Sequence, residues 1–565
     1  MKKNFLILCL SPLTLLALTG CHLIIFPSVD TSYSSEKDSL IPSESESSES
    51  APTSNPESSE DTTSINESSE PVTSEETPSE SEESSLDESS EEDSSTSEEE
   101  VFKPALENSE EYLEFWNPST YISLSINMSQ SAANFINNYQ SNHGDSTYHD
   151  YYVPCTVNLT VNDAHYTFEE VGIRQKGNLS RRTMLIDNHF SLDSLVHFKL
   201  NFQETFDDEE YDDIPALQEF KKTWSDSSLR KERKNRTLFD MEKIDIKWNR
   251  NDDATKVKQS FAYKMFRDNG VIAGHTTLAD TTLSINGSNP VNTTYEILEC
   301  IDKVLIKRFF DKAHAGGDLY KCTYSYKPAD MCNYSNEDIG VEDNVSGYHP
   351  PYDLKTNKKS SDHSAIQHFF SVINDSASSA SAYKANLEEV MNVENFIMYE
   401  SIAYLMGNFD DLRNNANNYY LYFDGTEQNI AYVIPYDFDR CLGCGCEGIQ
   451  DYMTNFSPES TKMQCDHRWQ TNTLYWRTIC STDESSSGYN NIERIEEYRA
   501  LYQSNIENIL NSGMMSESAF TSYVNSFPNS YRGNPNGAGN NNTTYGDYLS
   551  RKVNIIKEYY NGVTI

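Results

Sequence analysis

The sequence predicts an α+β protein in two lobes, a β-rich one followed by a helical one, behind a disordered acidic tether. Three observations support this prediction. Short alternations of apolar and polar residues recur between residues 121 and 300, which is the pattern of half-buried strands. Longer apolar stretches with helical spacing dominate from residue 393 onward. Residues 31–100 consist almost entirely of Ser, Glu, Thr, Pro and Asp. A strand-rich segment followed by a helix-rich one indicates the α+β class.

The first 21 residues have the organisation of a secretion signal. Lys2 and Lys3 precede an apolar run, residues 5–18, that is too short and too interrupted for a good membrane-spanning helix. Leu18-Thr19-Gly20-Cys21 resembles a bacterial lipobox. Lipid on Cys21 would hold the mature protein on the extracellular face of the cell membrane without spanning it. The alternative is a plain signal peptide with an unmodified Cys21.

The tether carries half of the net negative charge of the chain. Residues 31–100 contain 23 acidic residues and one lysine, a net charge of −22 within the −44 of the whole protein. Such a segment cannot bury enough apolar surface to offset the entropy of ordering, and its charges repel one another, so it is predicted to be disordered and extended. A tail that binds cations or a partner is the alternative. This acidity argues against nucleic acid as a partner.

The rest of the chain is long enough for two lobes with their own cores. The predicted parts are a lipoprotein signal peptide at 1–21, a disordered linker at 22–110, an N-lobe at 111–325 and a C-lobe at 326–565. Nine cysteines follow Cys21, and because this number is odd, at least one is free or pairs between molecules. Disulfides, buried thiols and a zinc site are the alternatives for one cluster. Its members are Cys441, Cys444, Cys446, Cys465 and His467.

The elements follow in order from local patterns. Alternation predicts strands at 121–126, 153–161, 165–174, 196–202 and 282–285. A helix at 252–269 places Val257, Phe261, Met265 and Phe266 on one side, and residues 295–310 are a strand followed by a helix. Residues 330–359 are a polar loop. A buried helix at 393–406 leads to a hairpin, 417–434, with Asp424-Gly425 in its turn. Helices at 492–510 and 548–560 enclose a Gly/Asn-rich loop at 529–545.

The most informative stretch joins the buried helix to this hairpin. Residues 407–422 place Asp410, Asp411 and several asparagines on a polar turn between two apolar segments. Ile434-Pro435-Tyr436-Asp437-Phe438-Asp439-Arg440 then closes the next apolar run with a second pair of acids. Phosphoryl transfer to a hydroxyl needs one carboxylate to orient the hydroxyl, and a carboxamide and a carboxylate to hold metal ions on the phosphates.

The order and spacing of several blocks resemble the CotH family, the spore-coat protein H group of atypical protein kinases. The similarity runs across most of residues 115–500. It is strongest at Asn408–Tyr422 and Pro435–Gly443. The other similar blocks are Gly172–Arg181, His197–Phe202, Ile285-Asn286-Gly287, Tyr295–Asp302, Leu319-Tyr320-Lys321 and Tyr352–Asn357. The resemblance implies an atypical kinase-like two-lobed fold that uses ATP with Mg²⁺ or Mn²⁺ to phosphorylate secreted or surface proteins.

The resemblance also implies roles for the acids and carboxamides. Asp410 would be the base that accepts or orients the substrate hydroxyl proton; the neighbouring Asp411 makes this assignment ambiguous by one place, and the Asn408-x-Asp410 spacing favours Asp410. Asn417, or Asn415, would be the carboxamide metal ligand. Asp437 would be the metal-binding acid that bridges the phosphates, and Asp439 is the other candidate.

The basic residues are assigned in the same way. Lys199 would contact the α- and β-phosphates, and Glu299 would position it through an ion pair. Arg174, Lys176 and Ser180 would lie on the turn that covers the phosphates. A triphosphate with its metal is a dense charge, so cations above it and acids below it are what its binding requires.

The sequence departs from the family pattern in places, and other functions remain open. Tyr436 stands where many relatives are expected to have tryptophan, Leu179 interrupts the polar turn, and neither a Gly-x-Gly-x-x-Gly loop nor a His-Arg-Asp triplet is present. Asp437 and Asp439 could hold a structural calcium ion instead. The main alternative to a kinase is a catalytically inactive CotH-domain surface adhesin or structural lipoprotein.

Overall fold

Seven strands of the computed structural model close into a barrel, in the order β1-β2-β3-β6-β7-β9-β8. β1 and β8 pair in parallel, and all other neighbours in the barrel are antiparallel. The strands are β1 Ile122–Met128, β2 Val153–Val161, β3 Ala164–Lys176, β6 His197–Asn201, β7 Lys243–Trp248, β8 Thr276–Ile285 and β9 Ser288–Glu299.

The structure describes residues 102–142, 150–177, 180–332, 334–344, 346–444, 456–460, 472–480, 492–539, 542–561, 563 and 565. All of them belong to one compact unit, residues 96–565. The predicted signal peptide, Cys21 and residues 31–100 lie outside the described residues, as do Cys446, Cys465 and His467.

Successive side chains of a strand point to opposite faces of the sheet, so one set from each barrel strand points inward. β1 shows this most simply: Ile122, Leu124, Ile126 and Met128 are all buried, and the residues between them are partly exposed. The predicted strands at 121–126, 153–161, 165–174, 196–202 and 282–285 all fall on barrel strands. β7 was not predicted, although Ile244 and Ile246 alternate with polar residues in the same way.

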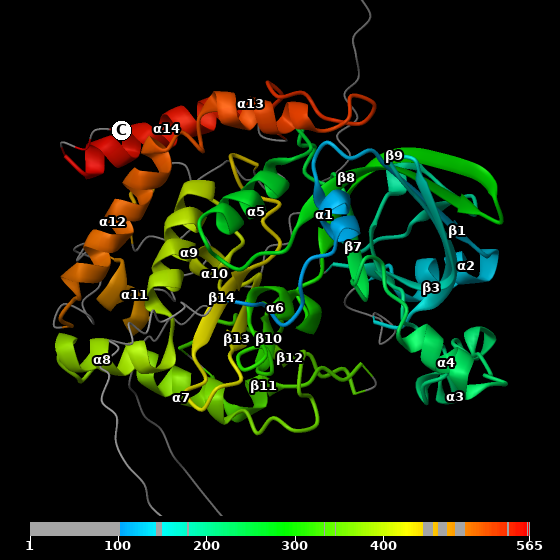
Figure 1. The fold of residues 1–565 in the computed structure, drawn as a ribbon, viewed down its shortest axis with the longest axis horizontal. Helices are drawn as coiled ribbons and strands as arrows, with labels where there is room; N and C mark the ends of the chain where they lie inside the picture. The colour runs from blue at the N-terminus through cyan, green and yellow to red at the C-terminus, as the bar shows by residue number, and fades with distance from the viewer. Residues whose placement is uncertain are drawn as a thin grey trace, which may run out of the picture. The chain divides into compact units, whose positions relative to one another are not determined.

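Short helices and a two-stranded ribbon lie around the barrel (Figure 1). α1 and α2 are N-terminal to β1 and β2, and a two-stranded ribbon, β4-β5, precedes β6. α3 and α4 lie between β6 and β7 in the chain. The bounds are α1 Glu110–Trp116, α2 Gln130–Tyr139, β4 Leu185–Ile186, β5 His189–Phe190, α3 Glu210–Asp213 and α4 Ser227–Lys234.

A second sheet has the strand order β11-β12-β10-β13-β14. Its strands are β10 Asp318–Cys322, β11 Ile339–Gly340, β12 Tyr352–Leu354, β13 Tyr419–Phe423 and β14 Ala431–Pro435. β13 and β14 form the predicted hairpin. β10 pairs with both β12 and β13, so the lobe boundary predicted between residues 325 and 326 divides this sheet. β10 therefore belongs with the C-terminal elements.

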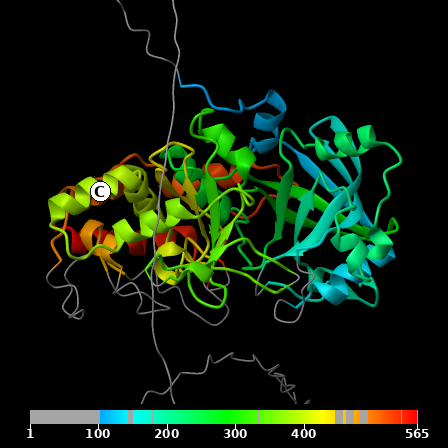
Figure 2. The same ribbon diagram turned by 90° about the horizontal axis from the view of Figure 1, so that it is seen from below.

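The remaining helices pack around this sheet, opposite the barrel in both ribbon views (Figures 1 and 2). α5 alone comes from the barrel region of the chain, between β7 and β8. The helices are α5 Lys258–Asp268, α6 Lys303–Phe309, α7 Ser364–Ile373, α8 Ala380–Val390, α9 Val393–Met406, α10 Leu412–Asn415, α11 Thr473–Thr478, α12 Glu496–Asn511, α13 Glu517–Ser526 and α14 Tyr545–Tyr559. The molecule is thus a mixed α+β fold, as expected.

α5 and α9 connect the two parts. α9 is buried around nearly its whole circumference, and α5 packs against it. The predicted helix 252–269 begins later than expected, at Lys258, because Asp253 turns the chain first: its carboxylate accepts hydrogen bonds from the backbone of Thr255 and Lys258. This placement brings the first turn of α5 to the edge of the barrel.

Two further observations concern the cysteines and the helices. The described cysteines are free thiols: Cys155, Cys300, Cys322, Cys332, Cys441, Cys444 and Cys480. Within the part of the chain that the structure describes, no helix combines the length and the apolar character that crossing a bilayer requires.

Candidate active site

Charged residues line one face of four neighbouring barrel strands. Because side chains alternate between the two faces of a strand, residues two apart share a face, and residues paired across strands share it as well. Residues paired across β3, β6, β7 and β9 form two rows of side chains on this face. One row is Arg174, Lys199 and Asp245, and the other contains Lys176, His197, Lys247 and Glu296. This face is polar because the alternate residues fill the barrel interior.

Asp245 neutralises the two lysines that the sequence assigned to phosphate binding. Its Oδ2 lies 2.7 Å from Nζ of Lys176, and its Oδ1 lies 3.4 Å from Nζ of Lys199. Burial alone would raise the pKa of Asp245, but these two ammonium groups hold it well below its usual range. Asp245 is therefore an ionised partner of both lysines.

Lys247 joins the barrel to the Asp-Phe-Asp segment. Its ammonium group contacts Oδ1 of Asp437, lies 2.9 Å from Oδ2 of Asp439, and donates to Oε1 of Gln259 on α5 at 2.9 Å. Lys247 is only 4% exposed. Burial would lower its pKa, and the two aspartates raise that pKa well above its ordinary value. Glu296 in turn accepts from Nε2 of Gln259 at 2.8 Å.

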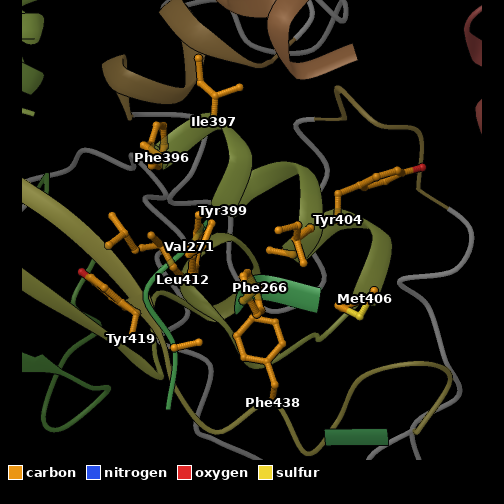
Figure 3. Packing of buried hydrophobic residues seen from close by; sticks show 14 of the residues in the cluster. Phe266, Val271, Phe396, Ile397, Tyr399, Tyr404, Met406, Leu412, Tyr419 and Phe438 are labelled. Atoms are coloured by element: carbon orange, nitrogen blue, oxygen red, sulfur yellow. The ribbon is translucent and has the colours of Figure 1, made fainter. Parts of the chain in front are cut away.

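The hydrophobic core fixes the position of both acids. Phe438, between Asp437 and Asp439, is fully buried and meets Phe266 of α5 edge-on, with ring centroids 5.0 Å apart (Figure 3). The backbone N–H of Asp437 donates to the hydroxyl of Tyr263 at 2.8 Å. Asp437 also has a φ of 54°, in the left-handed region that aspartate tolerates better than most residues. The buried ring and this turn direct the two carboxylates toward Lys247.

Asp410 is held by the two carboxamides that the sequence singled out. Its Oδ1 accepts from Nδ2 of Asn415 at 2.6 Å and from Nδ2 of Asn417 at 3.0 Å. The Oδ1 of Asn417 accepts the backbone N–H of Tyr324 at 2.8 Å. Burial raises the pKa of Asp410, with Arg440 acting in the opposite direction. A carboxylate with a raised pKa is a better proton acceptor than an ordinary surface aspartate.

The neighbouring acid has a structural role. Asp411 is fully buried, and its Oδ1 caps α10 by accepting the backbone N–H of Asn414 at 2.9 Å. Burial, and then the nearby Glu400, raise its pKa well above the usual range. The two adjacent acids therefore differ in environment, because Asp411 is fully buried and Asp410 is only partly buried.

Short contacts tie the Asp410 turn to the Asp437 segment. Nδ2 of Asn418 donates to the carbonyl of Asp410 at 2.8 Å, and the carbonyl of Asn418 accepts the N–H of Tyr436 at 3.2 Å. Asp437 is close enough to raise the pKa of Asp410 further. The acids that the sequence predicted to cooperate thus lie in one site.

Glu400 of α9 is fully buried and near Asp411. Its burial makes the stability of the protein depend on pH. One of its oxygens accepts from the hydroxyl of Tyr475, the other has no hydrogen-bond partner among the described residues, and burial raises the pKa of Glu400 to about 7. Between the ordinary glutamate pKa of 4.5 and about 7, the unfolded chain has lost this proton while the folded protein keeps it. Stability therefore falls as pH rises through this window.

Glu400→Gln removes the titrating group and keeps the acceptor for Tyr475. The free energy of unfolding of the variant, relative to the wild type, should be higher at pH 8 than at pH 4.5 by about 3 kcal/mol. Denaturant titrations at the two pH values measure this difference. Glu389→Gln, an exposed change on α8, is the control and should show no such pH dependence. Parallel pH profiles for Glu400→Gln and the wild type would contradict the prediction.

Glu299 does not pair with Lys199, so that part of the prediction is wrong. Glu299 accepts from the hydroxyl of Tyr112 at 2.8 Å and contacts Nδ1 of His275 at 3.0 Å and Nε of Arg308 at 3.6 Å. The reason is strand parity: Glu299 is opposite Ile244, whereas Lys199 is opposite Asp245 one residue on, and consecutive residues face opposite sides of a sheet. Glu299 thereby anchors α1 to the barrel.

Of the residues predicted to lie on the turn that covers the phosphates, only Lys176 lies near Asp437. Nζ of Lys176 lies 5.4 Å from the ring centre of Tyr436, next to Asp437, whereas Arg174 forms its ion pair with Asp150. Gly177 has a φ of 105°, and a Cβ there would lie 1.9 Å from Oγ of Ser180, so only glycine fits. Ser180 packs against this glycine.

Lys247 was missed by sequence reasoning, as was its partner Gln259. The signal was present, because Lys243-Ile244-Asp245-Ile246-Lys247-Trp248 alternates as clearly as the strand that carries Lys199. A lysine on an alternating strand, with an amphipathic helix as the next element of the chain, is the pattern to look for. Its pairing with Asp437, however, joins residues 190 positions apart.

The donor chemistry fits a hard divalent cation. Asp437 and Asp439 offer carboxylate oxygens, which Mg²⁺ and Mn²⁺ prefer, and an ammonium group already bridges them as a stand-in cation. Asn415 and Asn417 add carboxamides at the adjoining turn. Among the described residues, no three His, Cys, Asp or Glu side chains converge on one metal position, so water or phosphate oxygens would complete the coordination.

Comparison with known proteins adds one finding. A family model described as CotH kinase protein matches residues 216–562, more than half of the chain. The match covers Lys247, Asp410 and Asp437, and it begins after the turn at 174–181 and after Lys199. No curated protein shows a significant match to the chain.

Proposed function

The chain belongs to the CotH kinase protein family, and from this membership and the geometry of the site we propose that it is an extracytoplasmic, membrane-anchored protein kinase. It transfers the γ-phosphate of ATP to hydroxyl groups of secreted or surface proteins. The single observation that carries the proposal is the contact of Lys247, on barrel strand β7, with Asp437 and Asp439 in the segment that follows β14.

The order of these residues along the chain supports the same function. Protein kinases use a strand lysine paired with a residue of a following helix, then a catalytic-loop aspartate and asparagine, then a metal-binding aspartate. Here Lys247 on β7 contacts Gln259 on the next helix, Asp410 and Asn415 follow after α9, and Asp437 comes last. We therefore propose that Lys247, and not Lys199 as the resemblance implied, contacts the phosphates.

Each residue then has a physical role. Asp410 accepts a hydrogen bond from the substrate hydroxyl and takes its proton as the new P–O bond forms and the bond to the ADP oxygen breaks. Asp437 and Asp439 would hold Mg²⁺ or Mn²⁺, which supplies positive charge on the phosphate oxygens when bound. Lys247 binds the phosphates, and Lys176 adds a second cation near Tyr436.

The location and the partners rest on the N-terminal sequence. The lipobox-like Leu18-Thr19-Gly20-Cys21 supports anchoring by lipid at Cys21. The acidic tether of residues 31–100 would then extend the catalytic unit away from the surface toward protein substrates, because its charges repel one another. The strongly acidic chain is a poor partner for nucleic acid.

Phosphate transfer to protein is the direct test. The full chain, incubated with γ-labelled ATP, Mn²⁺ or Mg²⁺ and a mixture of secreted proteins, should produce acid-stable protein label. Asp437→Asn removes one metal-holding charge while keeping the shape of the side chain, and should reduce the rate by about 10³-fold. Asp163→Asn, an exposed change in the β2–β3 turn, is the matched control and should keep full activity.

One observation favours a second candidate function, a non-catalytic surface-binding protein. Gln259 is neutral at the position where protein kinases pair the strand lysine with glutamate. A folded wild-type protein that transfers no label with either metal and binds no ATP would support this candidate and exclude the kinase.

A further inference from the structure

The positive charge of Lys247 is balanced by Asp437 and Asp439, and its partner on α5 is neutral. Among the described residues, its ammonium group is bonded to Asp437, Asp439 and the uncharged amide of Gln259. Asp437 and Asp439 are the only acids with which Lys247 forms an ion pair among the described residues. Glu296, which lies opposite Lys247 on β9, accepts hydrogen bonds from Nε2 of Gln259 at 2.8 Å and from Oγ of Ser260 at 2.7 Å.

The two acids are more accessible than the lysine they bind. The side chains of Asp437 and Asp439 are 34% and 23% exposed, whereas that of Lys247 is 5% exposed. A cation from solvent can therefore approach the carboxylates. If it displaces Lys247, however, it leaves a buried ammonium group with the neutral amide of Gln259 as its one hydrogen-bond partner among the described residues, which is costly.

We propose that Lys247 acts as a built-in competitor of the divalent cation, occupying the carboxylates of Asp437 and Asp439 until a triphosphate offers it a replacement partner. The nucleotide part of this inference rests on the proposed function. Metal and nucleotide then bind cooperatively, because each removes part of the cost of binding the other. A glutamate in place of Gln259 would retain Lys247 and abolish the competition.

Binding of Mn²⁺ alone, without nucleotide, tests the proposal on the full chain. Electron paramagnetic resonance of free Mn²⁺ gives the dissociation constant without any need for activity. Lys247→Met should bind Mn²⁺ at least about tenfold more tightly than the wild type, within the usual range of coupling between sites. Lys199→Met is the matched control: it removes an equal charge from the same face, but its partner is Asp245. Its Mn²⁺ affinity should stay within about threefold of the wild type.

Equal or weaker Mn²⁺ binding by Lys247→Met would overturn the proposal, and so would equal tightening by Lys199→Met. Gln259→Glu keeps the lysine and gives it an acid of its own, so it should also tighten Mn²⁺ binding; if Lys247→Met does not fold, wild-type affinity in Gln259→Glu overturns the proposal.

The proposed activity is tested separately. Tighter Mn²⁺ binding by Lys247→Met, together with no phosphate transfer and no ATP binding by the wild type, would support the competition and exclude the kinase. Absence of nucleotide-free Mn²⁺ binding in every variant would overturn the competition, whereas phosphate transfer by the wild type would still support the kinase.

Discussion

Asp410→Asn is expected to reduce kcat for phosphate transfer by about 10²–10⁴-fold, the usual contribution of a positioned general base. The KM for ATP should change little, because Asp410 contacts Asn415 and Asn417 and not the lysine assigned to the phosphates. The amide of the variant can still accept a hydrogen bond from the substrate hydroxyl, but it cannot take the proton. Steady-state kinetics with varied ATP separates the two parameters.

Asp411→Asn is the matched control for this prediction. Asp411 is the adjacent acid, but it is fully buried and caps α10 through Asn414. Asparagine is a good cap as well, so the helix should keep its start and kcat should stay close to that of the wild type. The assignment of the base would have to be exchanged if Asp411→Asn, and not Asp410→Asn, lost activity.

Phe438→Ala is expected to lower the free energy of unfolding by about 3–5 kcal/mol, the cost of emptying a buried aromatic site. Phe438 is fully buried and contacts Phe266 on α5, the helix that also carries Gln259 (Figure 3). Asp437 and Asp439 flank this ring, so the loss of its anchor should also weaken Mn²⁺ binding in the protein that remains folded. Denaturant unfolding and Mn²⁺ titration below the unfolding transition measure the two effects.

Phe102→Ala provides the comparison, because Phe102 is 63% exposed. Its removal should change the free energy of unfolding by no more than about 0.5 kcal/mol. A similar small change for Phe438→Ala would mean that the Asp-Phe-Asp segment is not held by the core.

Much of the site was predictable because its chemistry is local in sequence. Asp410, Asn415 and Asn417 lie within eight positions of one another, and Asp437 and Asp439 flank a single apolar residue. Turns and caps of this kind are written in adjacent residues. The same holds for the barrel strands at 121–126 and 153–161, whose alternation shows which side chains are buried.

The pairing of the lysines was not predictable in this way. Lys199 and Lys247 both lie on alternating strands, and each could have faced the acids. Strand register selects Asp245 as the partner of Lys199, and a shift of one residue along β9 turns Glu299 away from it toward Tyr112. Register depends on how seven strands close into a barrel, which no short stretch of sequence specifies.

The amino-acid sequence alone predicted the α+β class, the family, the acids and carboxamides of the candidate site and the composition of the acidic tether, because each depends on residue type and short-range spacing. Folding in three dimensions placed Lys247 against Asp437 and Asp439 and Lys199 against Asp245, buried Asp411 more deeply than Asp410, and brought Glu299 to Tyr112 of α1. Those outcomes depend on contacts between residues far apart in the chain, whose energies follow from burial, register and charge pairing that exist only once the barrel and helices have packed.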